Sequence, residues 1–137
     1  MKPIFDRTTD ALAASLKLRS LRHNVATSNI ANAETPGYKA KVVDFEEALS
    51  RAIDLEGATA QSASSAEHFA IGPGAISRAR ADVYDNPEAN VTNDQNTVDL
   101  EKEMATMQEN SILYKAALQM INKKLGSLRY AVTEGGR

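Results

Sequence analysis

The sequence predicts a mainly α-helical protein in which long N- and C-terminal helices pair as a coiled-coil-like bundle, with a loop-rich middle segment. Three observations predict this fold. Apolar residues recur at heptad spacing near both ends, turn-forming residues concentrate between them, and aromatic residues make up only 5% of the 137 residues, with no Trp. Such spacing keeps one stripe of side chains facing a partner helix. The chain is expected to form one domain.

The first helix is expected within residues 1–35. Its apolar residues recur at heptad spacing, and the stripe consists of Ile4, Ala11, Ala14, Leu18, Leu21 and Val25. Leu18, Leu21 and Val25 are therefore expected to pack against other helices, including those of other subunits. The exposed face of this helix is expected to carry Lys17, Arg19 and Arg22.

A turn is expected to end this helix. Pro36 disfavours the helical conformation at Thr35, and Gly37 can adopt the positive φ that a type II turn requires after Pro36. Asn29 and Asn32 lie in the last turns of the predicted helix, where their amides can bond to backbone groups exposed at the helix end.

Residues 36–56 are expected to hold this turn, a short extended segment and a short amphipathic helix over 46–55. Asp44 is a suitable cap for that helix. Residues 57–96 contain little of their own core and are predicted to be loop-rich, since Gly, Pro, Asn and Asp are frequent there. The pattern also admits short strands near 68–71 and 82–84.

The last helix is expected within residues 97–137 and carries the clearest pattern in the chain. Its heptad seam consists of Leu100, Met104, Met107, Ser111, Tyr114, Leu118, Ile121, Leu125, Leu128 and Val132, in which only Ser111 is polar apart from the hydroxyl of Tyr114. Between residues 112 and 121 the helix is apolar around most of its circumference, as buried helices are. Burial by neighbouring subunits is the favoured explanation, and a core formed within one chain is the alternative.

Composition and motifs argue against chemistry and against several kinds of ligand. The net charge of −2 does not favour nucleic acid, and no apolar run approaches the ~20 residues that span a bilayer. The chain has no Cys, and His23 and His68 lie without a catalytic arrangement around them. The acid-rich residues 82–99 do not fit a calcium loop. No enzyme activity, metal, cofactor or small-molecule substrate is expected.

Two segments resemble the flagellar basal-body rod protein family. Residues 28–38 read SNIANAETPGY, and residues 96–104 read NTVDLEKEM. The first resembles the signature that ends the N-terminal helix of flagellar axial proteins, and the second resembles proximal rod members. The motif residues are Asn29, Asn32, Thr35, Pro36, Gly37 and Tyr38.

The resemblance implies a structural subunit of the proximal rod that assembles helically, transmits motor torque and forms part of the export channel. Implied partners are other copies of the chain, a FlgC-like proximal rod protein and a FliE-like adaptor between export gate and MS ring. The implied location is the periplasmic rod of the basal body, reached through the flagellar type III apparatus without a cleaved signal peptide, which agrees with the lack of an apolar run after Met1. A soluble helical secretion chaperone is the alternative.

Overall fold

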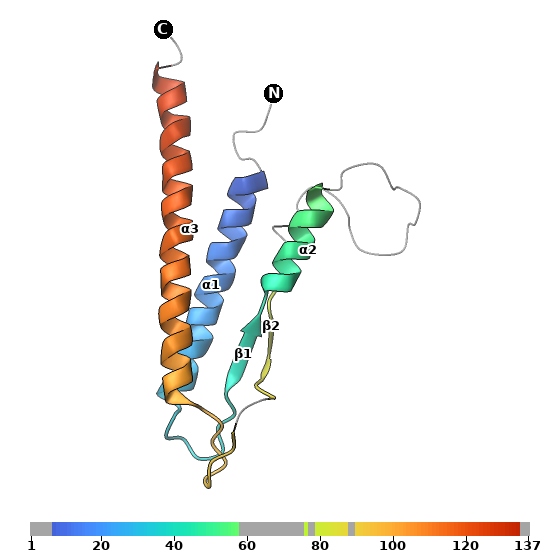
Figure 1. The fold of residues 1–137 in the computed structure, drawn as a ribbon, viewed down its shortest axis with the longest axis vertical. Helices are drawn as coiled ribbons and strands as arrows, with labels where there is room; N and C mark the ends of the chain where they lie inside the picture. The colour runs from blue at the N-terminus through green and yellow to red at the C-terminus, as the bar shows by residue number, and fades with distance from the viewer. Residues whose placement is uncertain (1–6, 58–75, 77–78, 88–89, 135–137) are drawn as a thin grey trace, which may run out of the picture.

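The computed structural model describes residues 7–57, 76, 79–87 and 90–134. Its elements in chain order are α1 (Arg7–Ala31), β1 (Lys41–Asp44), α2 (Glu46–Gly57), β2 (Asp82–Asp85) and α3 (Leu100–Glu134). In Figure 1, α1 lies between α3 on one side and the β1, β2 and α2 layer on the other. The predicted mainly α-helical fold is confirmed.

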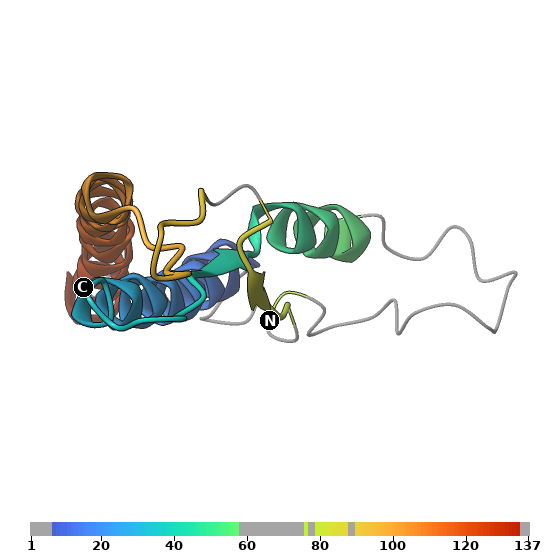
Figure 2. The ribbon, with the colours of Figure 1, turned by 90° about the horizontal axis from the view of Figure 1, so that it is seen from below.

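The two long helices pack side by side and run antiparallel (Figures 1 and 2). α1 has 25 residues and α3 has 35, so the C-terminal part of α3 extends beyond α1. At 1.5 Å per residue α3 is about 50 Å long. The helix begins where the sequence predicts, because the amide of Lys102 donates to Oδ1 of Asp99 at 3.1 Å and Asp99 thereby caps the first turn.

The two short strands pair antiparallel, with Val42 opposite Tyr84 and Val43 opposite Val83. The strand predicted near 82–84 is therefore confirmed, and its partner lies in the extended segment after the turn. The strand considered near 68–71 lies outside the described residues. Pairing these strands brings the segment before α3 back to the segment after α1, which closes the lower end of the molecule in Figure 1.

A small apolar core lies between α1 and the strands. Phe45, Leu18 and Val43 are its buried centre, and Val25, Leu49, Ala79 and Ala81 pack around them. Phe45 is only 1% exposed and occupies the position before α2, where its carbonyl accepts from the amide of Leu49 at 2.8 Å. The prediction that Asp44 caps α2 is wrong, because Asp44 belongs to β1 and Phe45 stands between it and the first helical residue, Glu46.

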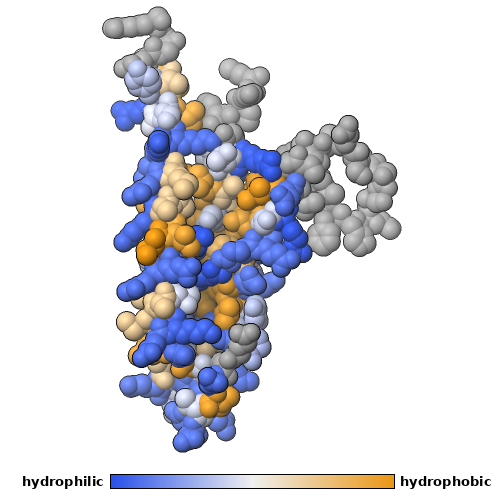
Figure 3. All heavy atoms as spheres, in the orientation of Figure 1, coloured by the Kyte–Doolittle hydropathy of each residue, from blue (hydrophilic) through white to orange (hydrophobic). Residues whose placement is uncertain are grey.

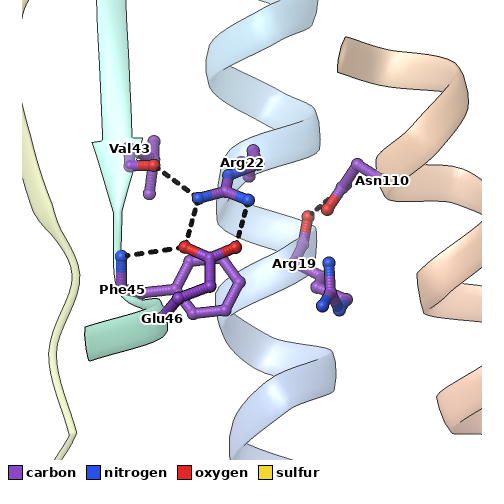
Figure 4. A network of polar contacts seen from close by, with 6 residues as sticks. All are labelled: Arg19, Arg22, Val43, Phe45, Glu46 and Asn110. Atoms are coloured by element: carbon purple, nitrogen blue, oxygen red, sulfur yellow. Dashed lines mark hydrogen bonds and ion pairs between the residues drawn. The ribbon is translucent and has the colours of Figure 1, made fainter. Parts of the chain in front are cut away.

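The sequence predicts Arg22 on the exposed face of the first helix. In the structure, Arg22 is half-buried instead. Its Nη2 donates to the Val43 carbonyl at 2.8 Å and to Oε2 of Glu46 at 2.6 Å, and its Nη1 donates to Oε1 of Glu46 (Figure 4). The guanidinium also lies 4.4 Å from the centroid of the Phe45 ring. The exposed-face prediction failed for Arg19 as well, because β1 and α2 fold back over this side of α1.

Replacing Glu46 by Gln is expected to remove an acid-sensitive part of the stability. Burial raises the pKa of Glu46, but the hydrogen bond and charge of Arg22 outweigh it and hold the pKa below the usual 4.5. A carboxyl group whose pKa is lower in the folded chain stabilises the fold above its unfolded pKa, and this contribution is lost as pH falls through the folded value. The carboxylate is half exposed, so the effect should stay below about 1 kcal/mol.

Thermal melts followed by circular dichroism measure this effect. The wild-type chain should melt above Glu46→Gln at pH 7, and the two melting temperatures should converge as pH falls below 4.5. Glu47→Gln, at a side chain that is 79% exposed, is the matched control and should keep the wild-type pH profile. A constant difference between wild type and Glu46→Gln at every pH would contradict the assignment.

Candidate assembly interface

The seam predicted on α3 divides into two columns in the structure. Met107, Tyr114, Ile121 and Leu128 are seven residues apart and half-buried, on the stripe that packs against α1. The second column, which we call the exposed column, consists of exposed Met104, Leu118 and Leu125, with half-buried Ser111 between the first two. Within it, Met104 is 49% and Leu118 39% exposed. Figure 3 shows apolar side chains at the surface among rows of polar ones.

Three residues of α3 alternate along the helix with the half-buried column. They are Glu103, Asn110 and Ala117. Glu103 is half-buried, whereas Asn110 and Ala117 are buried. Nδ2 of Asn110 donates to the backbone carbonyl of Arg19 at 2.8 Å, which joins the middle of α3 to α1. Periodicity of apolar residues could not find this stripe, because only alternate positions along it are large and apolar. The α1 contact therefore uses one side of the predicted seam and leaves Met104, Leu118 and Leu125 on the other side exposed.

The remaining seam and stripe residues are placed as follows. Leu100 is exposed at the start of α3 and Val132 near its end. On α1, Leu18 and Val25 pack within the core of the chain itself, whereas Leu21 is exposed. Leu113 and Met120 add exposed apolar area on the other flank of α3, and Ile112 is exposed on its far side. The sequence-based expectation that residues 112–121 are apolar around the helix is matched by this distribution.

The turn motif joins three parts of the chain through Asn29. Its Nδ2 donates to the Lys41 carbonyl at 2.7 Å and to Oε1 of Glu103 at 2.9 Å. Its Oδ1 accepts from the Lys41 amide at 3.0 Å and from the hydroxyl of Tyr38 at 3.3 Å. One side chain thus holds β1, the turn and α3 together, which is more than the helix-end role that the sequence indicates.

The turn itself has the predicted type II geometry. Gly37 has φ +73°, and the Tyr38 amide donates to the Thr35 carbonyl at 3.2 Å across exposed Pro36. Asn32 acts at the helix end as predicted, with Nδ2 donating to the Ser28 carbonyl at 2.8 Å. The turn is also tied to the segment before α3, because the amide of Gly37 donates to the Asp94 carbonyl at 2.9 Å.

The side chain of Asn96 binds the chain just after α1, although the two segments lie more than sixty residues apart in the sequence. Its Nδ2 lies 2.9 Å from the carbonyls of Asn32 and Ala33 and 2.8 Å from that of Thr35, and donates to them. Its Oδ1 accepts from the amide of Val98 at 2.7 Å. Carbonyls at a helix end lack donors within the helix, and the Asn96 amide supplies a donor to them. No sequence pattern indicates this structural role, since Asn96 lies in a run of polar residues.

Glu103 is a half-buried acidic group in the joint between the end of α1 and α3. Burial raises its pKa above the usual 4.5, while the hydrogen bond from Asn29 and the charge of Lys102 act in the opposite direction. The side chain therefore serves as an acceptor that orients Asn29, and it is partly dehydrated when it does so.

The described residues offer packing and hydrogen bonding rather than a reactive centre. Among them, no group of three His, Cys, Asp or Glu side chains is arranged to hold a metal ion. None of the helices in the described part of the chain is long and apolar enough to cross a membrane. The functional surface that the geometry offers is the α1–α3 pair with its exposed column.

Comparisons with known proteins agree with this class of protein. A family model described as "Flagella basal body rod protein" matches residues 11–39, which span most of α1 and the turn. The flagellar basal body rod protein FlgB of Aeromonas hydrophila is 36% identical over 128 residues, covering 93% of this chain and 94% of that protein. FlgB of Cereibacter sphaeroides is 38% identical over 120 residues, covering 88% and 89%. FlgB of Salmonella typhimurium is 31% identical over 126 residues, covering 89% of each.

The fold and these matches define a helical structural subunit of the flagellar rod. The chain belongs to the FlgB family of flagellar basal body rod proteins. It is a structural component of the proximal rod in the flagellar basal body and assembles with other rod components. The comparisons give no support to the secretion chaperone considered as the alternative.

Proposed function

We propose that the exposed column of α3 is covered by helices of neighbouring rod subunits, and that this contact builds the rod. The observation that carries the proposal is that only one column of the heptad seam packs against α1. Met104, Leu118 and Leu125 continue the heptad pattern but remain exposed beside the α1 contact. Heptad positions that stay uncovered in one chain are typical of surfaces that bury in an assembly. Leu21 of α1 and Leu100 of α3 are further exposed apolar residues of the two helices.

The proposed neighbours are other copies of this chain, a FlgC-like proximal rod protein and a FliE-like adaptor. In this proposal the contacts are head-to-tail, because contacts between different surfaces generate open helical tubes. The tube encloses part of the export channel and transmits torque through many interdigitated side chains. The support comes from membership of the rod family and from the distribution of exposed apolar residues over several sides of α3.

The proposal treats residues 1–137 as a single axial domain that reaches the periplasmic rod unfolded, through the flagellar type III apparatus. The small core supports this route. Only eight described apolar residues are buried, so much of the apolar surface becomes covered only when subunits meet. A chain that completes its burial in the assembly stays easier to unfold before export.

Leu118→Ala is expected to reduce incorporation into basal bodies at least tenfold while leaving the isolated chain folded. Leu118 is 39% exposed in the single chain, so its truncation should change the free energy of unfolding by less than about 1 kcal/mol. In the rod the same truncation would leave a cavity that costs about 2–5 kcal/mol at each contact. Ile121→Ala should weaken assembly as well, with a larger cost to the chain itself because Ile121 is half-buried.

Purified basal bodies, probed for the chain by quantitative immunoblotting, measure incorporation. Lys123→Glu is the control, since it reverses an exposed charge on the opposite side of α3. It should assemble much better than Leu118→Ala, and circular dichroism should show the same helix content for both purified chains. Wild-type motility and wild-type incorporation of Leu118→Ala would overturn the proposed interface.

A further inference from the structure

A polar cleft interrupts the exposed column at Ser111. It lies between α1 and α3, has a volume of about 300 Å³, and is lined by Arg19, His23, Asn110, Ser111 and Lys115, together with Ser20 and Tyr114. These residues include two full positive charges and no carboxylate. Ser111 belongs to both the cleft and the exposed column, so a helix that covers the column also passes over the cleft.

Two buried polar atoms of residues that line this cleft have no hydrogen-bond partner among the described residues. They are Nη1 of Arg19, which is a donor, and Oδ1 of Asn110, which is an acceptor. Figure 4 shows both residues at the contact between α1 and α3, joined through the Arg19 backbone. A buried donor without a partner costs free energy, and a cationic donor costs most. Nη1 of Arg19 therefore has no acceptor among the described residues of the isolated chain.

We propose that the cleft receives one Asp or Glu side chain from an apolar helix of a neighbouring rod subunit. A carboxylate supplies acceptors for Arg19 and for the Lys115 ammonium, and charge-assisted bonds of this kind are the stronger ones.

The acid would fix the register of the two helices. Apolar contacts along Met104, Leu118 and Leu125 resemble one another when the partner slides by a heptad, whereas only one register places a carboxylate at Ser111. A single polar layer in an apolar seam has this register-setting effect in coiled coils. The inference rests on the proposed function, because it assumes that a neighbouring subunit covers the exposed column.

Charge reversal in the cleft tests the proposal. Lys115→Glu changes an exposed side chain and should leave the fold of the full chain intact, but it places like charges together in the assembly. We expect its incorporation into purified basal bodies to fall at least tenfold, while Lys123→Glu, which reverses an exposed charge outside the cleft, stays within twofold of wild type. Equal incorporation of both variants would overturn the inference.

Photo-crosslinking identifies the occupant. In flagellated cells, p-benzoyl-phenylalanine in place of exposed Ser20 should crosslink to a helical segment of a rod subunit, and mass spectrometry should find an Asp or Glu among apolar residues there. Reversing that acid to Lys should restore incorporation of Lys115→Glu. A crosslinked segment without a carboxylate, or failure of this rescue, would overturn the inference.

Failure of this inference and failure of the proposed function give different results. If Leu118→Ala is excluded from the rod while Lys115→Glu incorporates normally, the exposed column is an interface and only the carboxylate site is wrong. If both variants incorporate normally, the proposed interface itself is wrong.

Discussion

Asn96→Ala is expected to lower the free energy of unfolding by about 2–3 kcal/mol, because it removes a buried amide that donates to three backbone carbonyls just after α1 and accepts from the Val98 amide. Asn96 is only 2% exposed, so water cannot readily replace the lost amide. For a domain of this size the loss is a large part of the total stability. Urea denaturation followed by circular dichroism measures it.

Asn93→Ala is the matched control for this experiment. Asn93 lies in the same loop and is exposed, so its truncation should change the stability by no more than about 0.5 kcal/mol. Equal destabilisation by the two substitutions would mean that the loop as a whole, rather than the Asn96 amide, stabilises the end of α1.

Phe45→Ala is expected to cost about 3–5 kcal/mol, the range for removing a buried aromatic side chain. The ring is 1% exposed, packs with Leu18 and Val43, and lies beneath the guanidinium of Arg22. Its removal should therefore detach β1 and α2 from α1 as well as open a cavity. The measurement is the shift in the urea midpoint together with the loss of amide protection in β1.

Tyr84→Ala tests whether this cost is specific to burial. Tyr84 lies on β2 opposite Val42 and is exposed. Tyr84→Ala should therefore lower the free energy of unfolding by no more than about 1 kcal/mol, through loss of the cross-strand contact. A cost for Tyr84→Ala as large as for Phe45→Ala would contradict the placement of the core around Phe45.

The sequence predicted the helices well because their signals are local. The breakers Pro36 and Gly37 end the first helix region, Asp99 caps α3, and the heptad spacing of α3 is uninterrupted. The type II turn also follows from local chemistry, since few residues other than Gly accept a φ of +73°. The family was predicted from residues 28–38, and the comparisons confirm it.

The contacts between distant segments could not be predicted in the same way. Apolar periodicity placed one seam on α3, whereas the stripe that meets α1 includes Glu103 and Asn110, whose burial depends on partners elsewhere in the chain. Arg22 appeared exposed because only the folding of β1 and α2 brings Glu46 and Phe45 over it. The roles of Asn29 and Asn96 likewise arise from tertiary contacts with Lys41 and with the α1 carbonyls.

The amide contacts of Asn29 and Asn96 join the two long helices at the end where the chain turns, while the C-terminal tip of α3 lies at the opposite end. Because α1 also packs along α3, with the Asn110 amide on the Arg19 carbonyl, only the part of α3 that extends beyond α1 can change direction without breaking this packing. Identical copies can therefore meet unlike neighbours by adjusting this last part of α3, while the base that sets the direction of the chain stays unchanged.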